Sequence, residues 1–146
     1  MNPIAAVAFA VIAASPCDPG EWAWASYYRE QSQVFCITET QALGSPKWTD
    51  TSSIPPLSLA RAAEIAMRQL GIIAGDPTGW TITGAELNPF WIIEDRWIWI
   101  IQLAPPEHLR SPNGSYHPVA IPVLMNGESV PPRIVPWEKI AKTEGF

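Results

Sequence analysis

Apolar residues recur at intervals of three and four between positions 58 and 71, and this pattern predicts a helix. The apolar positions that would share one face of the helix are Leu59, Ala62, Ala63, Ala66, Met67 and Leu70. Ser58 can accept hydrogen bonds from the first turn, and Gly71 is suited to end the helix.

Three segments that follow this helix are expected to form strands. Residues 80–87 (WTITGAEL) alternate, with Gly84 at a bulge, and residues 116–125 end at Asn126-Gly127, a strong hairpin signal. Residues 96–103 (RWIWIIQL) are apolar on both faces, so this strand is predicted to be central and covered on each side. A helix followed by antiparallel strands predicts an α+β fold, with one main helix packed on an antiparallel sheet of about four to five strands.

Prolines limit how far that sheet can extend. Pro118 and Pro122 are four residues apart, so their missing N–H groups lie on the same side of one strand. With a two-residue turn at Asn126-Gly127, that side of the strand faces away from the returning strand. Pro131 and Pro132 on the returning strand are adjacent, so one of them must face the hairpin partner and interrupt the ladder. Such prolines are typical of an edge or an interrupted region of a sheet.

The segment before the helix is aromatic and less regular. Residues 21–33 allow a helical spacing that places Trp24, Tyr27 and Tyr28 on one face. Residues 34–40 (VFCITET) have the composition of a strand, and residues 44–56 that of a loop.

The N-terminus and the cysteines both favour export. Residues 4–14 form an apolar run that is too short to span a bilayer and is similar to a secretory signal, although no basic residue precedes it. Residues 1–15 are therefore expected to be a signal peptide or a buried apolar segment, with no spanning membrane segment after signal removal. Cys17 and Cys36 are the only cysteines, and an oxidising compartment favours a disulfide between them over two unpaired thiols. Export would place the protein in the periplasm, at the cell surface or outside the cell.

Composition and charge exclude several classes of function. A length of 146 residues fits one domain, and nine scattered basic residues against fourteen acidic ones make nucleic acid an unexpected partner. His108 and His117 are the only histidines, and no GxSxG-like motif is present. Glu94-Asp95 could do acid–base work, but adjacent carboxylates before a strand are more typical of a solvated turn. We expect no enzyme activity, no cofactor and no metal site.

Eight tryptophans are the most unusual feature of the composition. Trp97 and Trp99 alternate in the predicted central strand and are expected in the core. Polar residues flank five others, which could form an aromatic contact surface: Trp22, Trp24, Trp48, Trp91 and Trp137. Residues 104–115 form a long, proline-restricted loop that suits a preorganised contact. The residues predicted to contact a partner are Trp24, Tyr28, Trp91, Glu107, His108, Arg110 and Trp137.

The segments LSLARAAEIAMRQLG, WTITGAEL, DRWIWIIQL and VAIPVLMNGESVPPRI give residues 57–135 a pattern that resembles the PepSY-like domains of exported bacterial proteins. The resemblance implies a PepSY/cystatin-like fold and a secreted or envelope module, in some members associated with peptidases as an inhibitory or propeptide-like element. It divides the chain into residues 1–15, an N-terminal extension at 16–56 with an aromatic segment and one strand, and a PepSY-like domain with a C-terminal tail at 57–146. The family offers no catalytic residues, and the many Trp and Pro residues depart from its pattern.

The leading hypothesis is an exported, non-catalytic module that binds another protein, with a peptidase as one class of partner. The alternative is a structural subunit of a larger envelope or extracellular assembly.

Overall fold

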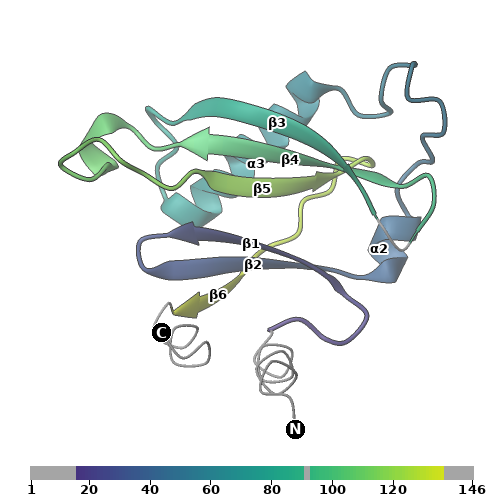
Figure 1. Ribbon diagram of the computed structural model, residues 1–146, viewed down its shortest axis with the longest axis horizontal. Helices are drawn as coiled ribbons and strands as arrows, with labels where there is room; N and C mark the ends of the chain where they lie inside the picture. Colours follow the sequence, from purple (N-terminus) through teal and green to yellow (C-terminus); the bar gives the residue numbers. More distant parts are fainter. Residues whose placement is uncertain (1–15, 91–92, 137–146) are drawn as a thin grey trace, which may run out of the picture.

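The computed structural model describes residues 16–90 and 93–136, which form two antiparallel sheets and one main helix (Figure 1). The elements are β1 (Trp22–Tyr28), β2 (Gln31–Ile37), α2 (Glu39–Leu43), α3 (Leu59–Ala74), β3 (Thr81–Pro89), β4 (Trp97–Ala104), the 3₁₀ helix η1 (Glu107–Leu109), β5 (Val119–Leu124) and β6 (Arg133–Pro136). Each sheet has three strands, in the orders β1-β2-β6 and β3-β4-β5. The predicted α+β class with one main helix is confirmed, and the apolar segment at 1–15 lies outside the described residues.

The predicted single sheet of four to five strands is replaced by two sheets that meet where β5 lies beside β1 (Figure 1). The N–H groups of Leu124 and Ala120 point away from β4, since they donate to Glu128 O (2.9 Å) and to Ser26 Oγ (2.8 Å). Pro122 lies between them on the same side and has no N–H group to donate. The proline therefore interrupts a ladder between β5 and β1, and a serine side chain bridges the two sheets instead.

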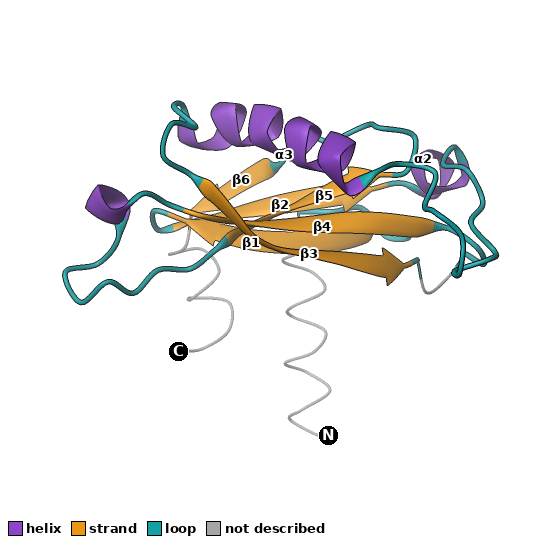
Figure 2. Ribbon diagram, turned by 90° about the horizontal axis from the view of Figure 1, so that it is seen from above, coloured by secondary structure: helices purple, strands orange, loops and turns teal. Residues whose placement is uncertain are grey.

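Helix α3 covers one face of the layer formed by the two sheets (Figure 2). Ser58 Oγ accepts from Arg61 N as predicted, but the helix continues past Gly71 and ends at Gly75, whose φ is +84°. The buried face is also turned from the predicted one, because Ile65 is buried whereas Leu59 is half exposed. The main core cluster contains Ala62, Ile65, Ala66 and Leu70 from α3 together with Trp99, Ile101, Leu103, Val119, Ile121 and Val123 from β4 and β5.

Strand β4 is central and apolar on both faces, which confirms that prediction. Ile98 and Ile100 point away from α3 into a second cluster with Phe90, Ile37 and Leu124. The predicted bulge at Gly84 is also confirmed, since the register of β3 against β4 shifts between Ile82 and Gly84. A Cβ on Gly84 would lie 3.0 Å from the side-chain oxygen of Gln102, so a larger residue here would require the Gln102 side chain to shift slightly.

The helical spacing predicted over residues 21–33 is wrong, because this segment forms the β1–β2 hairpin. In WAWASYY, burial alternates with a period of two: Trp22, Trp24, Ser26 and Tyr28 are buried or half-buried and the residues between them are exposed, as in a strand with one buried face. The turn residues Arg29 and Glu30 have φ values of +49° and +60°, the conformation of a type I′ turn. Neither residue is Gly or Asn, so the usual sequence signal for this turn is missing.

The hairpin that follows β5 differs from the predicted two-residue turn by one residue. Gly127 N donates to Leu124 O, and Leu124 N donates to Glu128 O, so the loop contains three residues and Gly127 takes a φ of +87°. Beyond the Leu124–Glu128 hydrogen bond, the returning chain pairs with β5 at an isolated bridge between Val123 and Ser129. The chain then crosses to form β6, which pairs with β2, so both ends of the described chain contribute to one sheet.

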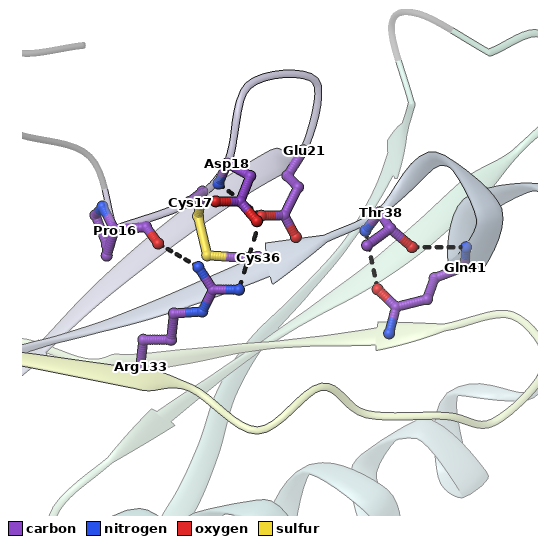
Figure 3. Close-up of polar contacts among 8 residues, drawn as sticks. All are labelled: Pro16, Cys17, Asp18, Glu21, Cys36, Thr38, Gln41 and Arg133. Carbon is purple, nitrogen blue, oxygen red and sulfur yellow. Dashed lines mark hydrogen bonds and ion pairs between the residues drawn. A yellow bond between two sulfur atoms is a disulfide. The ribbon is translucent and has the colours of Figure 1, made fainter. Parts of the chain in front are cut away.

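A disulfide joins Cys17 to Cys36 of β2, as predicted (Figure 3). Beside it, the Arg133 guanidinium donates to Pro16 O and lies 3.7 Å from the carboxylate of Glu21 (Figure 3). These contacts tie the first described residues to both β2 and β6. Among the described residues, no helix is both long enough and apolar enough to cross a membrane.

Candidate functional site

One concave site among the described residues lies where the loop after α2 meets the residues that flank the end of β3 and the start of β4. It is a cleft with a volume of about 490 Å³. Its lining residues are Trp48, Thr49, Thr51, Pro89, Phe90, Ile93, Glu94, Asp95 and Trp97, and we call it the Trp48–Trp97 cleft. Its size is within the range of ligand-binding pockets in proteins.

Two hydrogen bonds hold the two sides of the cleft together. Trp48 N donates to Asp95 O (2.9 Å), and the indole Nε1 of Trp97 donates to Trp48 O (3.1 Å). The two indole rings also pack edge to face, with centroids 5.2 Å apart and an interplanar angle of 71°. Residues 49 positions apart in sequence are therefore fixed against each other before any partner binds.

The loop that carries Trp48 is stabilised by its own side chains. The indole Nε1 of Trp48 donates to Ser53 Oγ (3.0 Å), and Ser53 Oγ in turn donates to Asp50 O. Both the hydroxyl and the backbone N–H of Ser52 donate to the Asp50 carboxylate, and these two bonds lower the pKa of Asp50. The loop therefore presents Trp48 in one orientation, with its ring buried and its N–H group satisfied.

The described part of the opposite wall comes from Pro89 and Phe90 at the end of β3 and from Ile93, Glu94 and Asp95 before β4. Phe90 N donates to Arg96 O (2.9 Å), which closes the turn, and Asp95 adopts a left-handed φ of +59°. Glu94 and Asp95 are both exposed and line the cleft, in agreement with the predicted solvated turn. Arg96 does not line the cleft, because its guanidinium donates to Leu43 O (3.5 Å).

The cleft has the chemistry of a binding site. It combines the half-buried ring of Trp97 and the buried rings of Trp48 and Phe90 with two carboxylates and two threonines. None of the described lining residues is a histidine or a cysteine. Across the described residues, no group of three His, Cys, Asp or Glu side chains is placed to hold a metal ion.

Trp24 and Tyr28, two of the predicted contact residues, take part in the core. Both are only partly exposed and contact the main core cluster. Trp24 stacks on Trp22 with ring centroids 5.9 Å apart, and Tyr28 packs edge to face on Trp80 at 5.5 Å. These rings help to join the β1–β2 hairpin to the rest of the protein.

The other predicted contact residues do not form one site with the cleft. Glu107 and His108 are exposed on η1, and Arg110 donates to Pro105 O (2.9 Å) while its guanidinium lies over the Tyr116 ring. These contacts restrict the conformation of the loop at residues 104–115, which the sequence predicted to be restricted by its prolines. Trp91 and Trp137 lie outside the described residues.

Sequence reasoning did not bring the cleft residues together. Trp48 was a candidate for an aromatic surface, Trp97 was assigned to the core, and the two acidic residues were treated as a turn. The available signal was a tryptophan in a polar loop rich in Ser and Thr, but no spacing rule connects that loop to a strand nearly fifty residues later.

No protein-family model, curated protein or solved structure matches this chain. The resemblance to PepSY-like domains therefore stays a prediction.

Proposed function

We propose that the protein is an exported, non-catalytic protein-binding module whose partner contacts the Trp48–Trp97 cleft. The observation that carries the proposal is the preformed aromatic cleft, in which hydrogen bonds and a ring contact between two distant segments fix both walls. Tryptophan contributes a large share of the binding energy in many protein interfaces. A cleft that is already ordered loses little conformational entropy when a partner binds.

Two features support export as part of the proposal. The Cys17–Cys36 disulfide suits an oxidising compartment, since cytosolic thiols are kept reduced. The apolar run at residues 4–14 suits a secretory signal. Within this proposal, the resemblance to PepSY-like domains makes a peptidase one class of partner. The protein would then act on the peptidase as an inhibitor or as a propeptide-like element.

A pair of matched variants tests the proposal. Thr51→Arg places a long side chain in the cleft at an exposed position, and Thr81→Arg places the same side chain at the opposite end of β3. The oxidised protein and both variants would be used to capture proteins from an envelope and secreted fraction, followed by calorimetry with the purified partner. We expect Thr51→Arg to weaken binding at least tenfold and Thr81→Arg to leave it unchanged. Equal binding by all three proteins would show that the cleft is not the interface.

The alternative, a structural subunit of an envelope or extracellular assembly, has one observation in its favour. Ile54 and Ile72 project into solvent with exposed fractions of 85% and 72%, although both are large and apolar. Neighbours in an assembly could cover them. Light scattering distinguishes the two proposals, because a binding module that acts alone should remain monomeric at low micromolar concentration.

A further inference from the structure

We infer that the Trp48–Trp97 cleft receives a basic side chain, lysine or arginine, from the partner polypeptide. This inference rests on the proposed function, because it names the chemistry that the same cleft would recognise.

The charges around the cleft favour a cation. Glu94 and Asp95 are exposed at the cleft, and neither forms an ion pair within the described part of the chain. None of the described lining residues is basic, and the nearby guanidinium of Arg96 is directed to Leu43 O. A positive group entering the cleft would therefore find two unpaired carboxylates, whereas an anion would be repelled by both.

The aromatic lining suits the same kind of side chain. An ammonium or guanidinium group is attracted to the face of an aromatic ring, most strongly to that of tryptophan. Among the described lining residues, the half-buried ring of Trp97 offers accessible aromatic surface, with Pro89 and Ile93 nearby for the aliphatic part of the side chain. The site thus offers apolar contact for the stem and carboxylates for the charged end.

A peptide titration tests the inference directly. The probes are acetylated, amidated pentapeptides Gly-Gly-X-Gly-Gly, in which X is lysine, arginine, norleucine or glutamate. Norleucine has a linear apolar side chain without the charge, so it separates charge from apolar contact. We expect lysine and arginine peptides to shift the indole N–H signals of Trp48 and Trp97 saturably, and the norleucine peptide to bind at least tenfold more weakly.

Matched variants localise the effect. The double variant Glu94→Gln/Asp95→Asn removes both charges with little change in shape, and Asn tolerates the left-handed φ at position 95. It should weaken binding of the lysine peptide at least tenfold. Glu86→Gln removes an exposed carboxylate on β3 that does not line the cleft, and it should leave binding unchanged.

Several results would overturn the inference. Equal binding of the norleucine and lysine peptides would show that the cleft recognises an apolar side chain and not a charged one. A shift of the indole signals caused by cellotetraose but not by the lysine peptide would indicate a carbohydrate ligand. If no peptide shifts the two indole signals while Thr51→Arg still abolishes capture of a partner, the inference fails and the proposed function stands. If Thr51→Arg captures the same partners as the unmodified protein, the proposed function itself fails.

Discussion

The Cys17–Cys36 disulfide should contribute about 3 kcal/mol to the free energy of unfolding. The bond joins residues separated by 19 positions. In the loop-entropy model, a cross-link over about 20 residues removes roughly 11 cal/mol/K from the unfolded ensemble, or about 3 kcal/mol at 25 °C. Cys36 is also held by pairing of β2 with β1, opposite Ala23. We therefore expect β2 to stay in place after reduction, so that the loss of stability arises in the unfolded state.

Urea unfolding followed by tryptophan fluorescence, with and without a phosphine reductant, measures this contribution. With a denaturant slope of about 2 kcal/mol per molar urea, loss of about 3 kcal/mol lowers the midpoint by about 1.5 M. Alkylation followed by mass spectrometry verifies that both thiols are free in the reduced sample.

The control is the double variant Cys17→Ser/Cys36→Ala, with serine at the partly exposed position and alanine at the buried one. Its midpoint should be close to that of the reduced protein and should not respond to reductant. A midpoint that falls by less than about 0.3 M on full reduction of the unmodified protein would refute the loop-entropy argument.

Three further predictions concern the core, the junction of the sheets and the cleft loop. Leu70→Ala empties a fully buried site beneath α3 and should cost about 2–5 kcal/mol of stability, measured by urea unfolding. Ser26→Ala removes the acceptor of the Ala120 N–H and should cost about 1–3 kcal/mol, with faster hydrogen exchange at Ala120. The hydrogen bonds from Ser52 lower the pKa of Asp50 in the folded protein. The stabilisation that they give the loop is therefore complete above the ordinary aspartate pKa of about 3.9, and it is lost as the pH falls through the lower pKa of the folded state. The indole N–H signal of Trp48 should report this loss.

Each of these predictions has a matched comparison. Ile72→Ala on the exposed side of α3 should change stability by less than about 0.5 kcal/mol, and an effect as large as that of Leu70→Ala would contradict the assigned burial. Unchanged exchange at Ala120 in the Ser26 variant would mean that the serine does not bridge the sheets. For the cleft loop, Asp50→Asn should remove the acid transition, and its persistence in that variant would assign the transition to another group.

The parts of the fold that could be predicted from sequence are those with a local pattern. The heptad-like spacing around Ala62 and Ala66 located α3, and the unbroken apolar run around Ile100 located the central strand. The exact buried face was less predictable, because Ile65 and Leu59 are equally apolar and only the position of the sheet decides which is covered.

The parts that could not be predicted depend on contacts between distant residues. The predicted two-residue turn placed Pro122 on the side of β5 away from the returning chain, and this was wrong, because the three-residue loop brings Glu128 to the side of Leu124 N and Pro122. The Trp48–Trp97 cleft depends on two hydrogen bonds between segments nearly fifty positions apart in sequence. Neither the loop nor the strand carries a signal for that partner.

Because β6 pairs with β2, the last strand of the described chain completes a sheet that the first strands begin. Ile37 ends β2, and Arg133 begins β6 almost a hundred residues later. At typical synthesis rates, one edge of β2 is therefore left open for about 5–20 s after it leaves the ribosome. An open edge of that kind can pair with other chains, so newly made molecules are most exposed to aggregation during this interval. Truncation before Arg133 would make that temporary exposure permanent.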